Sequence, residues 1–350
     1  MNNVPNLRFP EFQGEWGKYR IEDITENISS GRCKSYSSNG KYNLYGSTGI
    51  IGKTDEACYE GNLVLVARVG ANAGFLQIIN EPCGITDNTL IIKPKKVDAQ
   101  YIYYFLQHFN LNRLFFGSGQ PLITGGMLKK VKVSLGNIQE QNKLTRLLSL
   151  LDERIATQNK IIDKLQSLIK GIAQHCIREL INGWEYVRLG DICKITTGKL
   201  DANAQVENGQ YPFFTCAERP SNIDSYAFDT EALLISGNGA NLGYINYHKG
   251  KFNAYQRTYV LDHFSVNIQY VKWALKVLLP QRIAIEKSSS NTPYIVLSTL
   301  ADLKIPIPNN SKQNQIADLM MSFERKLSTK LALSDLYNKQ KQYLLRQMFI

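Results

Sequence analysis

Apolar residues in two long stretches of the chain fall at alternating steps of four and three residues. This spacing predicts amphipathic helices that pack in a coiled coil. The first helix is expected over about residues 139–178, interrupted at Gln158, and the second, with a looser pattern, over the last part of the chain. The predicted seam residues are Leu144, Leu148, Leu151, Ile155, Ile162, Leu165, Ile169, Ile172, Ile316, Met320, Phe323, Leu327, Leu331, Leu344 and Met348. A helix of that length is roughly 60 Å long, too long for one small domain, so the two helices are expected to pack together.

The segments that precede these helices have a different pattern. Between Trp16 and about Leu135, short β-rich runs such as residues 62–69 and 89–94 are broken by clusters of Gly, Ser and Asn. Such runs are typical of strands joined by turns. One helix is expected among them, with Asp98 as its N-cap. The pattern predicts a compact α+β domain.

The chain contains two copies of one unit. The segment WGKYRIEDI, which begins at Trp16, returns as WEYVRLGDI from Trp184. The segment GANAGF, from Gly70, returns as GANLGY, from Gly239, so the two matches keep nearly the same register. The period is therefore about half the chain, which is too long for a solenoid repeat and indicates a duplicated domain.

The predicted order is a globular domain over residues 1–137, a connector helix over 138–180, a second globular domain over 181–308 and a second connector helix over 309–350. The two copies are equivalent around a pseudo-two-fold axis only if the helices run antiparallel. We therefore expect an α+β protein in which two similar β-rich domains are separated by two long α-helices, packed as an antiparallel coiled coil that forms a rigid bar.

The charge balance favours a nucleic-acid partner. The chain has 41 Lys and Arg against 30 Asp and Glu, a formal charge of +11, and a pI near 9.2. Such a charge is typical of proteins that bind phosphate backbones, although the solvated face of a coiled coil accounts for it equally well. Two similar domains about a two-fold axis can read two half-sites of duplex DNA, so double-stranded DNA is the expected partner.

Composition disfavours several other classes of protein. No apolar run approaches the length of a membrane span, and the first residues lack the layout of a signal peptide. We therefore expect a cytoplasmic protein without a membrane partner. None of the six cysteines is in a CxxC pair, and the four histidines give no HxxxH spacing, so neither structural zinc nor a disulfide framework is expected.

Three motifs resemble catalytic or cofactor-binding signatures. GSTGIIGKT, from Gly46, has five residues between the glycines where a P-loop has four. FxGxG at residues 115–119 and NTPY at 291–294 suggest the cofactor loop and the catalytic loop of an adenine methyltransferase. However, SGQP at 118–121 aligns with SNTP at 290–293, so the two fragments are the same loop in two copies and not two loops of one active site. GNGANLG at 237–243 resembles a dinucleotide turn, yet its copy at 70–74 lacks the first glycine, which predicts a tight turn instead. No catalytic residue and no metal site are predicted.

Both copies resemble the specificity subunit of type I restriction-modification enzymes. PNLRFPEFQGEW with RIEDI, and later WEYVRLGDI with ITTGK, are similar to the start of the family's target-recognition domain. In that family each domain closes with a strand, a proline-containing turn and then EQ, an aliphatic residue, a leucine pair and an acidic residue that open the long helix. Residues 131–155 and 305–327 resemble this pattern, although the first copy has Leu135-Gly136 in place of the prolines and the second has Lys312 where the first has Glu140.

The resemblance implies a sequence-specific DNA-binding subunit without catalytic activity of its own. Each globular domain would be a target-recognition domain that reads one part of a bipartite, asymmetric target. Two modification subunits, adenine N6 methyltransferases that carry S-adenosylmethionine, would dock on the chain, and restriction subunits that use ATP and Mg would join through them in phage defence. The alternatives are a coiled-coil scaffold with no DNA role and a stand-alone DNA adenine methyltransferase.

Polar residues on glycine-bounded loops at equivalent positions of the two copies are the candidate base contacts, because amide, hydroxyl and guanidinium groups read base edges. The candidates are Ser47, Thr48, Arg68, Asn72, Asn88, Ser118, Gln120, Thr215, Arg219, Asn238, Asn241, Gln256, Arg257, Asn291 and Thr292. The alternative at each position is a loop residue that bonds its own backbone. Differences between aligned residues, such as Asn88 and Arg257, predict unlike half-sites.

Overall fold

The computed structural model describes residues 3–33, 36–115, 120–179, 183–287 and 294–350. The chain divides into two compact units: the first unit is residues 1–159 with 332–350, and the second unit is residues 160–331. Each unit therefore contains one copy of the repeat together with part of each long helix.

The two copies have a similar order of elements. The first copy comprises β1 (Gly17–Arg20), η1 (Ile21–Ile24), β2 (Thr25–Ser30), β3 (Tyr42–Gly46), β4 (Gly49–Thr54), β5 (Leu63–Ala67), β6 (Leu76–Ile79), β7 (Cys83–Ile85), β8 (Thr89–Pro94), α1 (Ala99–Phe109), η2 (Leu111–Leu114), α2 (Gly125–Lys129) and β9 (Lys132–Leu135). The second comprises β10 (Glu185–Arg188), α4 (Leu189–Ile192), β11 (Lys194–Thr197), η4 (Ala202–Ala204), β12 (Tyr211–Phe214), β13 (Ser221–Ile223), β14 (Phe228–Ser236), β15 (Ile245–Ala254), β16 (Thr258–Asp262), α5 (Ile268–Lys287), α6 (Leu297–Ala301) and β17 (Lys304–Ile307). The long helices are α3 (Ile138–Gln174), followed by the π-helical turn η3 (His175–Glu179), and α7 (Asn310–Met348).

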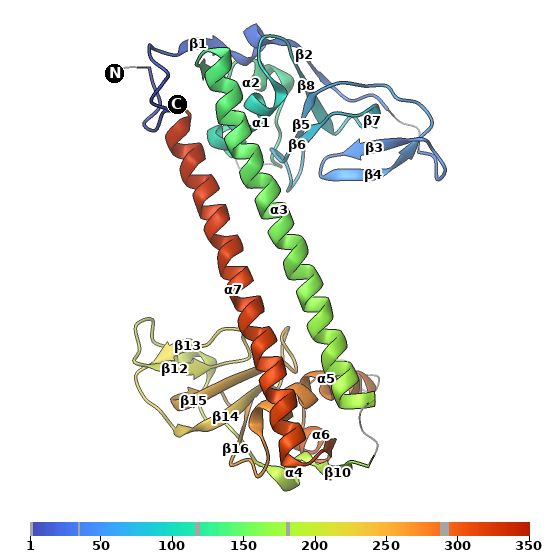
Figure 1. The fold of residues 1–350 in the computed structure, drawn as a ribbon, viewed down its shortest axis with the longest axis vertical. Helices are drawn as coiled ribbons and strands as arrows, with labels where there is room; N and C mark the ends of the chain where they lie inside the picture. The colour runs from blue at the N-terminus through green and yellow to red at the C-terminus, as the bar shows by residue number, and fades with distance from the viewer. Residues whose placement is uncertain (1–2, 34–35, 116–119, 180–182, 288–293) are drawn as a thin grey trace. The chain divides into compact units, whose positions relative to one another are not determined.

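A four-stranded sheet in the order β2-β8-β5-β6 forms the centre of the first copy (Figure 1). All the residues of β5 are buried, because a further layer covers each face of the sheet. Val64 and Val66 share a core with α1 and the start of α3. Leu63 and Leu65 pack with β7, which belongs to the three-stranded sheet β4-β3-β7. The first copy is the α+β domain that the sequence predicts.

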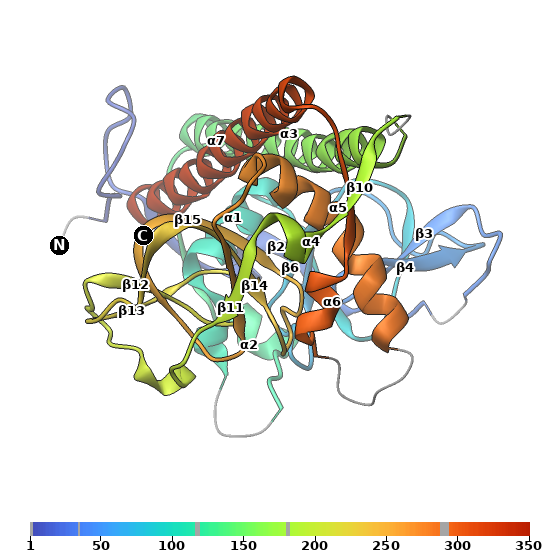
Figure 2. The same cartoon turned by 90° about the horizontal axis from the view of Figure 1, so that it is seen from below.

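In the second copy, β10 and β17 pair as a two-stranded sheet, and the other strands form a six-stranded sheet in the order β11-β16-β14-β15-β12-β13. On β14, Leu233 and Ile235 share a core with α5, whereas Leu234 packs with Phe252 on the opposite face. The short helices α4 and α6 lie side by side (Figure 2). Alternation along β14 thus buries both faces of this sheet.

Details of the turns and caps repeat between the copies. Gly70 and Gly239 have φ angles of 82° and 78°, and Gly74 and Gly243 have 87° and 81°. Glycine adopts this left-handed backbone without steric cost, so the predicted tight turn is confirmed in both copies. The Asp98 carboxylate accepts a hydrogen bond from the backbone N–H of Gln100 at 2.6 Å, which confirms the predicted N-cap of α1.

The long helices α3 and α7 run antiparallel within the units, as predicted. In the first unit, Leu148 near the start of α3 shares a core with Met348 at the end of α7. One turn further along α3, Asp152 forms an ion pair of 2.6 Å with Lys341, which lies earlier in α7. In the second unit, the later residues of α3 share a core with the earlier residues of α7. The first predicted helix, residues 139–178, matches α3 with its π-helical turn.

The seam prediction is wrong at one position. Leu331 is exposed, whereas the other predicted seam residues are buried or half-buried. The spacing of four and three instead continues through positions 330, 334, 337 and 341. These are Lys, Ser, Tyr and Lys, so a search for apolar residues passes over them. Gln158, which interrupts the apolar pattern of α3, also occupies a buried position.

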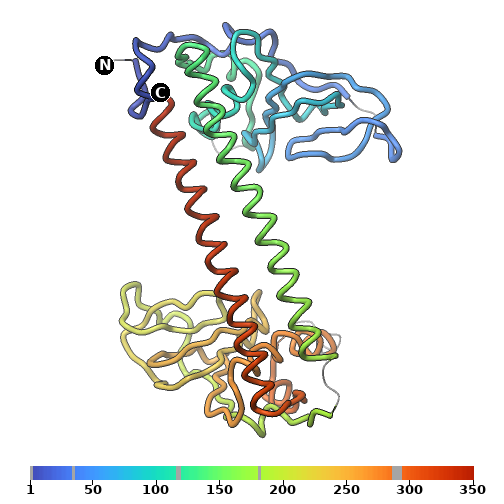
Figure 3. The backbone as a smooth tube through the Cα atoms, viewed as in Figure 1, coloured from blue at the N-terminus to red at the C-terminus, as the bar shows by residue number. Residues whose placement is uncertain are grey.

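The segment before β1 is held by a buried glutamate at the start of α3. Glu140 is only 2% exposed, and its carboxylate accepts hydrogen bonds from Arg8 at 2.7 and 2.9 Å and from the Trp16 indole N–H at 3.1 Å. The backbone N–H of Leu7 bonds the carbonyl of Gln347 at 2.9 Å, which joins this segment to the end of α7 (Figure 3). Two parts of the repeat signature, the opening Trp16 and the helix-opening Glu140, therefore meet in space.

A second ionic group fixes α5 to α7 in the second unit. Lys272, which is 7% exposed, and Lys276 bind the two carboxylate oxygens of Glu324 at 2.6 and 3.0 Å. Burial lowers the pKa of Lys272, although its hydrogen bond to Glu324 opposes this effect. Burial acts to raise the pKa of Glu324, but the two ammonium groups outweigh it, and the pKa is lowered.

Acid is expected to destabilise the second unit of the wild type more steeply than that of the Glu324→Gln variant. A carboxyl group whose pKa is lowered by folding contributes stability above its unfolded pKa, and this stability is lost as the pH falls through the folded value. The variant has lower stability at neutral pH but lacks this acid-dependent part. Urea unfolding between about pH 6 and about pH 3 measures the slopes. The exposed Glu185→Gln serves as control, and equal slopes for Glu324→Gln and wild type would contradict the prediction.

Candidate nucleic-acid interface

Four loops that carry predicted DNA contacts meet at one end of the sheet in the first copy. We call residues 46–48, 68–74, 86–88 and 120–123 the first loop cluster. The backbone N–H of Arg68 donates to the carbonyl of Asn88 at 2.9 Å, and the carbonyl of Arg68 accepts from Ile123 at 2.8 Å. The Ser47 hydroxyl donates to the same Asn88 carbonyl at 3.2 Å. Backbone bonds of β5 and the adjoining turns thus bring Ser47, Arg68 and Asn88 together.

The remaining candidates of the first copy lie around the same loops. Asn72 is exposed in the turn between the two left-handed glycines, and Thr48 is exposed in the turn between β3 and β4. Gln120 lies beside Gly70, where an added Cβ would come within 3.6 Å of the Gln120 amide nitrogen. The candidate Ser118 lies outside the described residues.

The second copy has an equivalent group of loops. Residues 215–219, 237–243, 255–257 and 294–295 form the second loop cluster. The backbone N–H of Gly237 donates to the carbonyl of Arg257 at 2.8 Å, and the carbonyl of Gly237 accepts from Ile295 at 2.8 Å. The Cys216 thiol, next to Thr215, donates to the Arg257 carbonyl at 3.5 Å.

The other candidates of the second copy are placed as follows. Asn238 and Asn241 are half-buried in the turn after β14, whereas Arg219 and Gln256 are exposed. The candidates Asn291 and Thr292 lie outside the described residues. All the candidates of this copy that the structure describes therefore belong to the second loop cluster.

The same backbone hydrogen bond occurs in both clusters, but the arginine is its donor in the first cluster and its acceptor in the second. It joins Arg68 to Asn88 in the first cluster and Gly237 to Arg257 in the second, at equivalent positions of the repeat. The first cluster therefore presents its arginine from the loop after β5, and the second presents its arginine from the turn before β16. The same backbone carries different chemistry in the two copies.

Several loop side chains are engaged in holding their own cluster. The Asn241 amide donates to the Cys216 carbonyl at 3.1 Å, and Ser47 bonds Asn88 as described, which fits the alternative of a backbone-bonding loop residue. The side chains of Asn72, Asn88 and Arg257 are exposed to solvent. Like the exposed Thr48, Gln120, Arg219 and Gln256, they are free to contact a ligand.

Two residues that position these loops were missed in the sequence. The Gln77 amide donates to the carbonyls of Gly46 and Ser47 at 2.9 and 3.2 Å. Asn246, at the equivalent position of the second copy, donates to the Ala217 carbonyl at 3.5 Å. A polar amide at the same position of a strand in both copies is the signal that could have identified them.

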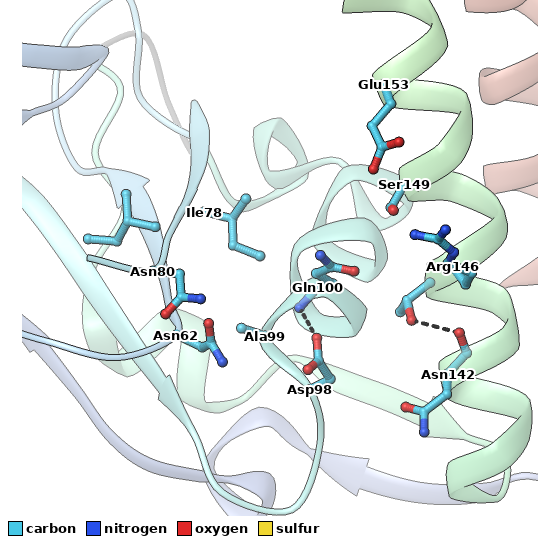
Figure 4. Close-up of a pocket in the computed structure, with 12 residues that line it drawn as sticks. Asn62, Ile78, Asn80, Asp98, Ala99, Gln100, Asn142, Arg146, Ser149 and Glu153 are labelled. Carbon is cyan, nitrogen blue, oxygen red and sulfur yellow. Dashed lines mark hydrogen bonds between the residues drawn. The ribbon is translucent and has the colours of Figure 1, made fainter.

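A polar groove of about 560 Å³ in the first unit lies between β6, the start of α1 and the first half of α3 (Figure 4). It is lined by Asn62, Ile78, Ile79, Asn80, Asp98, Ala99, Gln100, Asn142, Thr145, Arg146, Ser149 and Glu153. The Asp98 carboxylate is already used to cap α1. The groove offers amide, hydroxyl and charged groups for hydrogen bonding, and its lining includes no cysteine or histidine nucleophile or base.

The described residues contain no group of three or more His, Cys, Asp or Glu that could hold a metal ion. No helix in the described ranges is long and apolar enough to cross a membrane. The structure describes all six cysteines and shows no disulfide among them. Burial raises the pKa of Cys83 to about 11 and that of Cys193 to about 12, so both thiols are protonated at neutral pH.

The family model of the type I restriction modification DNA specificity domain matches this chain twice, over residues 13–167 and 181–333. These matches cover most of the chain and coincide with the two copies of the repeat.

Individual relatives and structures agree with the family match. The EcoDI specificity subunit of Escherichia coli is 44% identical over 135 residues, which span 39% of this chain and 30% of that subunit. The MjaIX specificity subunit of Methanocaldococcus jannaschii is 24% identical over 84% of this chain and 83% of its own length. The crystal structure of the S subunit of a type I system from M. genitalium has a similar fold, with a TM-score of 0.76, 19% identity and 99% of both chains covered. The repeated domain, its loops and these matches together show that the chain belongs to the type I restriction-modification specificity subunits.

Proposed function

We propose that this chain reads a bipartite, asymmetric target in double-stranded DNA, one half-site with each loop cluster. The observation that carries the proposal is that the same backbone hydrogen bond joins different residues in the two clusters. It joins Arg68 to Asn88 in the first cluster and Gly237 to Arg257 in the second. Arginine favours guanine and asparagine favours adenine in the major groove. Different side chains at equivalent backbone positions would therefore select half-sites of different base sequence.

The net charge of +11 supports this proposal. Phosphate neutralisation supplies sequence-independent affinity, and the exposed amides and guanidinium groups of the clusters would supply the discrimination between bases. The candidate contacts named above form the proposed base-reading set.

We place the docking of the modification subunits on α3 and α7. In the first unit a groove of about 340 Å³ runs between these helices, lined by Leu147, Leu150, Leu151, Arg154, Gln340 and Leu344. Leu150, Leu336 and Tyr343 are exposed on the same helices. Apolar helix faces left in water are typical of sites that receive a partner helix.

In this proposal the chain supplies no catalytic residue. Two modification subunits would carry S-adenosylmethionine and methylate adenine at N6, and restriction subunits that use ATP and Mg would join through them. The chain would act in the cytoplasm, where it meets DNA.

The test is a methylation reaction on DNA of random sequence with labelled S-adenosylmethionine. Reactions contain this chain, its modification subunit, both, or neither, and the products are sequenced for N6-methyladenine. We expect methylation at one two-part, non-palindromic motif, and only when both proteins are present. Methyl transfer by this chain alone would establish a stand-alone enzyme. The absence of both methylation and salt-dependent DNA binding would indicate that the chain is a coiled-coil scaffold with no DNA role.

A further inference from the structure

Each loop cluster is flanked by two exposed apolar side chains at equivalent positions. In the first copy these are Phe75, 48% exposed, and Leu122, 41% exposed. In the second copy they are Tyr244, 39% exposed, and Tyr294, 54% exposed. Phe75 and Tyr244 each follow the second left-handed glycine of the turn, and Leu122 and Tyr294 each precede a buried isoleucine.

Strand alternation explains why these side chains point outward. Leu76 and Ile123 pack in the main core of the first unit, and Ile245 and Ile295 pack in that of the second. Neighbouring residues on an extended chain face opposite directions. Because the next residue in each case is anchored in the core, the preceding apolar side chain is directed to the surface.

Backbone hydrogen bonds also fix the position of the two aromatic residues. The N–H of Phe75 donates to the Asn72 carbonyl at 3.0 Å, and the N–H of Tyr244 donates to the Asn241 carbonyl at 2.9 Å. The carbonyls of Phe75 and Tyr244 accept from the residue at the end of β5 or β14, at 2.9 and 3.0 Å. The backbone of both aromatic residues is therefore held in the same turn geometry in the two copies.

The second member of each pair belongs to the same loops as the proposed base contacts. Leu122 pairs with Val69, the residue after Arg68. Tyr294 precedes Ile295, whose N–H bonds the carbonyl of Gly237. The apolar pairs are therefore continuous with the surface that carries the polar readers.

Resting on the proposed function, we propose that these four side chains pack against the apolar surface of DNA, the thymine methyl groups and deoxyribose faces, with one pair in each half-site. Apolar contact with the thymine methyl is a known form of base reading, and packing of an apolar side chain on the carbon face of a deoxyribose is favourable because it removes both surfaces from water. The occupant is assigned as DNA because both pairs adjoin the base-reading loops and recur once in each copy.

The test uses the complex with the modification subunit and the motif found by the methylation assay. We expect Phe75→Ala with Leu122→Ala, and Tyr244→Ala with Tyr294→Ala, each to weaken binding about tenfold, because each pair loses apolar surface buried against DNA. The slope of affinity against salt should stay unchanged, because no phosphate contact is removed. Each double variant should lose discrimination only at the thymine positions that its apolar pair contacts, keep the preference set by the polar readers, and leave the preference of the other half-site intact.

The matched controls are Tyr19→Ala and Tyr186→Ala, exposed aromatic residues outside the clusters, which should bind like the wild type. The variants Phe75→Leu and Tyr244→Leu retain apolar surface and should keep most of the affinity, which separates lost contact from misfolding. Duplexes with deoxyuridine for thymine distinguish the two DNA surfaces. Wild-type affinity should fall to that of the alanine variants if the methyl is contacted and stay high if the sugar is contacted.

Wild-type affinity in both alanine double variants, with the target still bound by the wild type, would overturn the inference and leave the proposed function standing. Lost association with the modification subunit, with DNA binding unchanged, would also overturn it and assign the patch to a protein contact. Failure of the wild-type complex to bind any specific duplex would remove the proposed function itself.

Discussion

Replacing Arg8 by methionine is expected to lower the free energy of unfolding of the first unit by about 3–5 kcal/mol. The Glu140 carboxylate is buried and takes two of its hydrogen bonds from the Arg8 guanidinium, at 2.7 and 2.9 Å. Removal of the arginine leaves a buried charge with the Trp16 indole as its remaining side-chain donor. Hydrogen exchange of peptides from residues 138–152, measured at increasing urea, reports the stability of this region.

Two further variants separate the buried charge from a general effect of the substitution. Arg20→Met removes an exposed arginine that pairs with Glu22 at 3.3 Å and should cost about 1 kcal/mol or less. Changing Arg8 and Glu140 together to methionine should recover most of the loss, because no unpaired charge remains. Similar losses of unfolding free energy for Arg8→Met and Arg20→Met would show that the buried ion pair stabilises the protein no more than an exposed one.

Substituting Arg257 by alanine is expected to weaken specific DNA binding about 10- to 100-fold and to relax base preference in one half-site only. The Arg257 side chain is exposed, while its backbone carbonyl accepts from Gly237 at 2.8 Å. The substitution therefore removes the guanidinium and leaves the turn in place. Binding of the complex to duplexes randomised in one half-site at a time measures both the affinity and the preference.

Asn88→Ala is the counterpart in the first copy and should relax the other half-site. Arg20→Ala, an exposed arginine outside both clusters, serves as the control for lost charge. A uniform loss of affinity on all duplexes, together with a shallower salt dependence, would instead assign Arg257 to a phosphate contact. Loss of preference in both half-sites would contradict the assignment of one cluster to each.

The repeat, the long helices and the cap of α1 could be predicted from the sequence because each depends on local spacing. The apolar steps of four and three identify one face of a helix without knowledge of its partner. The N-cap Asp98 bonds a residue only two positions away. The prediction was wrong at Leu331 because the seam there passes through Lys, Ser and Tyr. Side chains of the opposite helix and solvent can accommodate these residues, but a search for apolar spacing does not find them.

The candidate site was predicted only in part. The glycine turns marked the right loops, because left-handed backbone requires glycine at positions visible in the sequence. Which loops meet was not visible, since Ser47, Arg68, Asn88 and Ile123 join through bonds between segments far apart in the chain. The amides Gln77 and Asn246, which hold the loops in position, were not predicted because they also bond segments far away in the chain.

The sequence by itself determined that this protein is a duplicated α+β domain with two heptad helices, because periodicity and repetition are properties of the chain. The tertiary structure decided which residues share a surface: the buried Glu140 pair, the Lys272 and Glu324 group, the two loop clusters and the exposed aromatic residues beside them. These features depend on contacts between distant segments, whose free energy is available only after the core has brought those segments together.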